Sequence, residues 1–181
     1  MGQELDRKLD ERQYRAAVDG ALETLRSASI DFNGGVLARA ETEVLLRRFV
    51  DALSDRAPHA RLWPEGDREV VADLLGRVAA RTANRERIWF ASAGGVAVAV
   101  EIPAQQLLAN ALHGFVSPAA DLMLSDPDIS TGICVELNRI QHGALQYEVV
   151  AWGEFDEALR AAISGGGEGW VPEPPGLDAR Q

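Results

Sequence analysis

The chain has 181 residues, of which 46% are hydrophobic and 25% charged, and its formal net charge is -10. This composition is typical of a globular protein that buries a core without needing disulfides or metals. The negative charge argues against nucleic acids and anionic membrane surfaces as partners, because both attract clustered lysine and arginine. We therefore predict a protein that binds neither nucleic acid nor a membrane.

The charge is unevenly distributed along the chain. Residues 1–100 hold 16 acidic and 15 basic side chains, whereas residues 101–181 hold 12 acidic and 3 basic ones. No lysine or arginine lies between Arg87 and Arg139. The second half of the sequence therefore carries nearly all of the net negative charge, which suits a basic protein partner.

Three features of the sequence indicate the compartment. Cys134 is the single cysteine, so no internal disulfide can form. Residues 1–13 are charged and lack the apolar region of a secretory signal. The longest strongly apolar stretch, 88–100, is shorter than the ~20 residues needed to cross a bilayer. We expect a cytoplasmic protein.

Helices are predicted at the start of the chain. Residues 3–27, 39–54 and 67–82 each place apolar side chains at helical spacing. The first of these helices is predicted either to pack on the core or to form a peripheral appendage. Residues 58–66 are predicted to be a loop, because they contain two prolines and a glycine.

The apolar pattern then changes to the alternation that is typical of strands. Residues 88–92 and 96–100 flank glycines and predict a β-hairpin. A short helix is predicted from Pro103 to about residue 113. Residues 133–138 and 145–149 alternate in the same way and predict a second hairpin.

The remaining segments complete an α+β fold. Residues 117–123 are predicted to form a helical turn, 125–131 a polar loop, 154–163 a last helix and 164–181 a flexible Gly/Pro-rich tail. Three N-terminal helices are thus followed by two hairpins that form a four-stranded, mainly antiparallel sheet, with a short helix between the hairpins and a final helix. We expect residues 1–163 to form a single domain.

Glu136 and Glu148 are the most informative polar residues. Both lie on the polar face of the second hairpin, and a turn near His142 and Gly143 places them directly opposite each other. Like charges at such positions destabilise a sheet unless they are solvated or paired. The pair is compatible with a solvated sheet face, with an anchor for a partner's arginine or lysine, or with acid–base chemistry.

No catalytic, cofactor or metal site is predicted. The three histidines are not spaced as metal ligands, and no zinc, phosphate-loop or nucleophile-elbow motif occurs. Cys134 shares a strand face with Glu136, whose negative charge disfavours the reactive thiolate. The Asp126-Pro127-Asp128 turn lacks the glycine and the distal glutamate of an EF-hand loop.

These observations predict a non-catalytic protein-binding module that engages a basic protein. In physical type alone, the chain is similar to immunity proteins that neutralise basic toxins and to acidic secretion chaperones, although no motif identifies either family. The alternatives are a small-molecule-binding protein or enzyme that uses Glu136 and Glu148 in a pocket between sheet and helices, and a homo-oligomer such as a homodimer. The predicted partner-binding residues are three acidic clusters and one aromatic side chain, provided that it is exposed: Asp121, Asp126, Asp128, Glu136, Glu148, Glu154, Asp156, Glu157 and Trp63.

Overall fold

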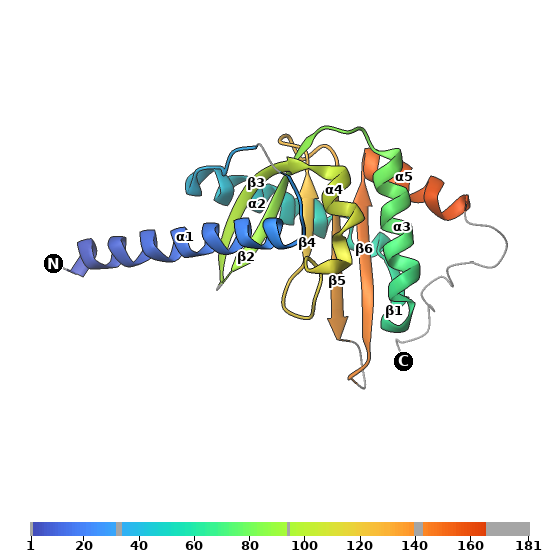
Figure 1. The fold of residues 1–181 in the computed structure, drawn as a ribbon, viewed down its shortest axis with the longest axis horizontal. Coiled ribbons are helices and arrows are strands. Elements are labelled where there is room, and N and C mark those ends of the chain that lie inside the picture. The colour runs from blue at the N-terminus through green and yellow to red at the C-terminus, as the bar shows by residue number, and fades with distance from the viewer. Residues whose placement is uncertain (1, 32–33, 94, 140–142, 166–181) are drawn as a thin grey trace.

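The computed structural model describes residues 2–31, 34–93, 95–139 and 143–165. Its six strands form one antiparallel sheet in the order β1-β6-β5-β4-β2-β3 (Figure 1). The strands are β1 Arg61–Pro64, β2 Glu86–Ala93, β3 Val96–Pro103, β4 Leu122–Ser125, β5 Gly132–Arg139 and β6 Leu145–Trp152. The helices are α1 Gly2–Ser27, α2 Arg39–Ser54, α3 Arg68–Arg81, α4 Ala104–Ala109 and α5 Glu154–Ser164. Short 3₁₀ turns occur at Ala57–His59, Glu65–Asp67 and Ala111–His113.

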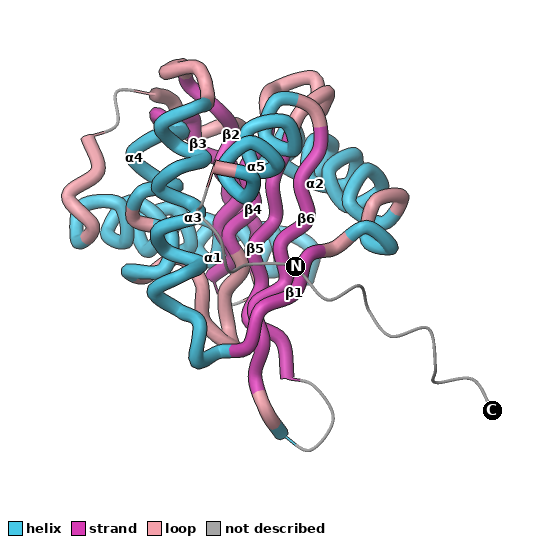
Figure 2. Tube along the Cα trace, turned by 90° about the vertical axis from the view of Figure 1, so that its right-hand side faces the viewer, coloured by secondary structure: helices cyan, strands magenta, loops and turns pink. Residues whose placement is uncertain are grey.

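The helices form two unequal layers on the sheet (Figure 2). Helices α1, α3, α4 and α5 bury the larger core against one face, which includes Trp89, Val98 and Val149. Helix α2 covers part of the other face, where Phe49 packs against Phe90 and Trp152. The α2 face is therefore the face on which part of the sheet is left without a covering helix.

Helix α1 has a packed half and a projecting half. Ala17, Ala21 and Leu25 are buried in the larger core, at the spacing that puts them on one side of a helix. The N-terminal half extends past the edge of the sheet (Figure 1), and Leu9 is 55% exposed. The helix is thus a core element at one end and a projection at the other.

The predicted α+β class is confirmed, but the four-stranded sheet is wrong. Strand β4 lies where a helical turn at 117–123 and a polar loop at 125–131 were predicted, and β1 lies in the predicted loop 58–66. Strand β4 exists because it pairs with both β2 and β5 and so joins the two hairpins into one sheet. Strand β1 is a short edge strand whose last residue, Pro64, has no N–H to extend the pairing.

Both predicted hairpins are present. Strand β2 pairs with β3, and β5 pairs with β6. Glu136 lies directly opposite Glu148, as the alternation predicted. The helix predicted at 103–113 is divided into α4 and a 3₁₀ turn at the non-helical residue Asn110.

Some of the predictions concern residues that the structure does not describe. His142 and residues 166–181, which include most of the predicted tail, lie outside the described residues. Within the described residues, no helix combines the length and the apolar character needed to cross a membrane.

Candidate functional site

Three carboxylates lie close together in the β4–β5–β6 part of the sheet, two of them on the α2 face of paired strands and the third in the residue before β4. Glu136 of β5 is paired with Glu148 of β6. Leu122 is paired with Val135, so the antiparallel register brings Asp121, which immediately precedes β4, next to Glu136. Neighbouring strands are about 4.8 Å apart, so the row spans about 10 Å. We call Asp121, Glu136 and Glu148 the acidic row.

One amide side chain holds the two glutamates together. Asn138 lies two residues beyond Glu136 on the same face of β5. Its Nδ2 donates to Oε2 of Glu136 at 2.9 Å and to Oε2 of Glu148 at 3.0 Å. The amide satisfies one oxygen of each carboxylate but supplies no positive charge. The repulsion between the two glutamates is therefore bridged without being neutralised.

Neighbouring groups also respond to the negative charge of the row. Burial and the charge of Glu136 raise the pKa of Asp121. Burial, followed by the charge of Glu136, raises the pKa of the Cys134 thiol, which donates to Oε1 of Glu136 at 3.4 Å. The cysteine is 1% exposed, so it is poorly suited to act as a nucleophile.

The described residues supply no counter-ion to the row. Among the described residues, no lysine or arginine forms an ion pair with Asp121, Glu136 or Glu148. Glu136 and Glu148 are partly exposed and Asp121 is exposed. Leu62 of β1 is paired with Glu148 and is 42% exposed, so an accessible apolar side chain ends the row.

A second acidic group, at the start of α5, is paired with arginines. Arg87 of β2 is 1% exposed and forms ion pairs with Glu154 and, at 3.6 Å, with Asp126. Its guanidinium also lies 5.4 Å from the centre of the Phe155 ring. Arg85 forms a further ion pair with Glu154 at 2.6 Å. The fold therefore uses these carboxylates to neutralise a buried arginine.

Glu154 is the centre of this second group. Its carboxylate also accepts a hydrogen bond from the backbone N–H of Ala83 at 2.6 Å. Burial acts to raise its pKa, but the Ala83 N–H and the guanidinium groups of Arg85 and Arg87 outweigh it and lower the pKa. The group is thus stabilised in its charged form.

Asp156 is paired as well. It accepts from Arg61 at 3.0 Å and from Arg160 at 2.8 Å. We call Asp126, Glu154 and Asp156 the arginine-paired group. These three predicted partner-binding residues are committed to contacts within the chain.

The other predicted residues, Asp128, Glu157 and Trp63, belong to neither group. Asp128 is exposed in the turn before β5, where hydrogen bonds with Asp126 and Ser130 lower its pKa. Glu157 is exposed in the first turn of α5. Trp63 is 1% exposed within the larger core, so in the isolated chain it does not meet the condition of exposure on which its predicted role depended.

A cavity of about 260 Å³ lies between α1, β2 and the segment 114–121. Trp89, Phe115 and Asp121 line it together with small residues of α1. Glu136 and Glu148 are not among its described lining residues. The small-molecule alternative, which places both glutamates in a pocket between sheet and helices, is not supported by this cavity.

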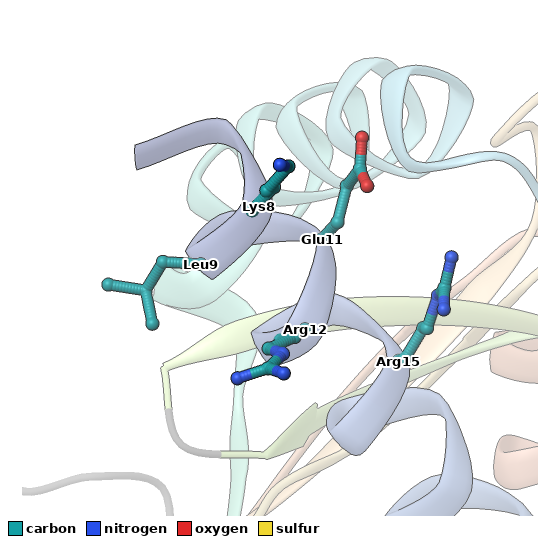
Figure 3. A pocket seen from close by; sticks show the side chains of 5 residues that line it. All are labelled: Lys8, Leu9, Glu11, Arg12 and Arg15. Carbon is teal, nitrogen blue, oxygen red and sulfur yellow. The ribbon is translucent and has the colours of Figure 1, made fainter. Parts of the chain in front are cut away.

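A hollow of about 370 Å³ lies on the projecting half of α1. Its lining side chains all come from this one helix and point in different directions (Figure 3). Such a set does not converge on a ligand.

No group of three or more His, Cys, Asp or Glu side chains in the described part of the chain is arranged to hold a metal ion.

Searches of protein-family models, of curated proteins and of solved structures find no match to this chain.

The sequence analysis did not identify Arg87 as an important residue. The sequence does indicate its burial, because Arg87 lies on the same face of β2 as Trp89 and Ala91, which are core residues. A cation at a core position predicts buried carboxylate partners. Those partners, 39 and 67 residues further along the chain, could not be chosen by any local pattern.

Proposed function

We propose that the protein is a non-catalytic protein-binding module whose acidic row holds a cationic segment of a basic partner protein. The observation that carries this proposal is the row itself, in which three neighbouring carboxylates have no arginine or lysine partner among the described residues. Other acidic residues of the same half of the chain do have such partners.

The row is suited to arginine or lysine from another molecule. A guanidinium placed over Glu136 and Glu148 would donate charge-assisted hydrogen bonds to both carboxylates, and such bonds are about twice as strong as neutral ones. Binding would also remove the repulsion between opposed carboxylates, which costs the free chain stability. The negative field would further accelerate the encounter with a basic partner.

A protein segment fits the surroundings better than a free cation does. Leu62 continues the row at 42% exposure and offers an apolar contact beside Glu148. A segment that carries arginine or lysine next to an apolar residue would engage both. The partner that we propose is a basic protein of the kind held by immunity proteins or secretion chaperones.

A non-catalytic role is supported by the state of the nearby groups. Burial and Glu136 raise the pKa of Cys134, which keeps the thiol protonated. The amide of Asn138 bridges both glutamates and occupies one oxygen of each carboxylate. The row thus offers charge for recognition rather than a reacting group.

The test compares the wild type with the double variant Glu136→Gln/Glu148→Gln. Each protein is immobilised and incubated with lysate of the source organism, and the retained proteins are quantified by mass spectrometry. We expect the wild type to retain one basic protein, the variant to retain at least about tenfold less, and retention to fall between about 50 and 300 mM salt.

The matched control is Glu65→Gln/Glu69→Gln, which makes the same chemical change on exposed residues near the start of α3. This variant should retain the partner as the wild type does. Equal retention by the Glu136→Gln/Glu148→Gln variant, or retention that does not change with salt, would contradict the proposal.

A further inference from the structure

A cleft of about 610 Å³ lies where the end of α2, the segment before β1, the end of β6 and the start of α5 meet. Its charged and titratable lining residues are Arg56, Arg61, Arg160, Asp156 and His59. Three guanidiniums thus face one carboxylate. When the three arginines and Asp156 are counted, and His59 is left out, the lining has a formal charge of about +2, in a chain whose net charge is -10.

The three arginines are held in place by other groups. Arg61 donates to Oδ1 of Asp156 at 3.0 Å, and Arg160 donates to Oδ2 of Asp156 at 2.8 Å. Arg56 donates to the backbone carbonyl of Ala52 at 2.8 Å and lies 5.3 Å from the centre of the Trp152 ring. Restraints of this kind reduce the entropy that a ligand must remove on binding.

Each arginine retains hydrogen-bonding capacity. A guanidinium has five N–H donors, and each of these contacts uses one of them. The Arg61 side chain is 20% exposed, so its charge lies within the cleft rather than in bulk solvent. The lining is therefore a set of donors oriented by contacts within the chain, in which Arg61 is mostly buried and Arg160 is exposed.

We propose that this cleft binds a small molecule that carries a phosphate group. Guanidinium donors match the spacing of phosphate oxygens, and a phosphate dianion would balance the local charge. The cleft lies within the ~300–1,000 Å³ range of small-molecule sites, so it has room for more than a phosphate ion. Gly153, with φ of 60°, also lines it and is the N-cap of α5, whose N-terminal end adds a partial positive charge.

The test is isothermal titration calorimetry of the full chain with pyrophosphate, at constant ionic strength. We expect saturable binding at one site in the wild type. Arg160→Gln and Arg56→Gln should each weaken this binding by about tenfold or more, because each removes a charge-assisted contact. The Arg160 side chain is 71% exposed and its ion pair with Asp156 contributes little to stability, so Arg160→Gln tests the site even if Arg56→Gln proves unstable.

Three control variants test whether pyrophosphate binds at the cleft. Arg26→Gln and Arg39→Gln remove exposed arginines outside the cleft and should leave pyrophosphate binding unchanged. The Glu136→Gln/Glu148→Gln variant should also bind it normally, because this cleft is independent of the acidic row. The proposal is overturned if pyrophosphate gives no saturable binding up to ~10 mM, or if the controls weaken binding as much as the cleft variants. It is also overturned if a polyglutamate peptide binds while pyrophosphate does not.

Discussion

Two groups of carboxylates in the second half of the chain lie in opposite electrostatic environments. The arginine-paired group is neutralised by Arg61, Arg85, Arg87 and Arg160. The acidic row has an amide bridge and no cation among the described residues. Three of those four arginines come from the first half of the chain. The uneven charge of the sequence is therefore partly evened out in the fold, whereas the acidic row brings three carboxylates together without an arginine or lysine partner among the described residues.

Burial explains the difference between the two groups. Arg87 is 1% exposed, and a charge in that position is tolerated only when opposite charges and hydrogen bonds surround it. The row lies on the part of the sheet face that remains partly open to solvent, where water screens the repulsion. The first group stabilises the fold, whereas the second carries a cost that a partner would relieve.

The largest effect is expected at the buried arginine. Arg87→Met should lower the free energy of unfolding by about 3 kcal/mol, because Asp126 and Glu154 lose their shared counter-ion while partly buried. Chemical denaturation of the variant and the wild type at neutral pH measures this difference.

Arg39→Met is the control for this prediction, since Arg39 and Glu43 form an exposed pair on α2. Its effect should stay within about 0.5 kcal/mol. An Arg87→Met variant as stable as Arg39→Met would mean that the arginine-paired group does not stabilise the fold, and the comparison would fail.

The strand pattern was sufficient to predict the central feature of the row. A period of two and a short connection fix which residues of a hairpin face each other, so Glu136 and Glu148 could be paired from the sequence alone. Strands β1 and β4 have four residues each, too few to show an alternation. Their existence depends on pairing with distant strands, and so does the position of Asp121 beside Glu136.

The ion-pair partners of Glu154 and Asp156 could not be predicted from the sequence. Glu154 and Asp156 begin a helix, where acidic residues are expected in any case because they favour the helix dipole. Nothing local distinguishes them from Glu157, which remains exposed. Their arginine partners lie 67 to 95 residues away along the chain, apart from Arg160 on the same helix. Packing selects these partners, and packing is set by the whole fold.

A second prediction uses the pH dependence of the arginine-paired group. The folded pKa of Glu154 is lowered, so folding favours its ionised form. Ionised Glu154 therefore stabilises the fold fully above its ordinary pKa of 4.5, and this stabilisation is lost as the pH falls through its lower pKa in the folded chain. Glu154→Gln should cost about 2 kcal/mol at pH 7, since the carboxylate accepts three charge-assisted bonds, and less in acid.

Urea denaturation of the Glu154→Gln variant and the wild type between neutral and acidic pH checks this sign. The difference in the free energy of unfolding between the two proteins should become smaller as the pH falls below 4.5, the ordinary pKa of Glu154. A gap that stays constant or widens in acid would show that the charge of Glu154 is not what stabilises the fold.

The smallest effect, of opposite sign, is expected in the acidic row. Burial and Glu136 raise the folded pKa of Asp121, so folding disfavours its charged form and stability falls as the pH rises above the ordinary value of 3.8. Asp121→Asn should therefore stabilise the chain at pH 7, by about 0.5 kcal/mol, and this gain should shrink with added salt and with falling pH. The exposed Asp19→Asn on α1 serves as the matched control and should show no such gain. Destabilisation by Asp121→Asn at low salt would mean that the row stabilises the free chain, which would remove the reason for a cationic partner to bind there.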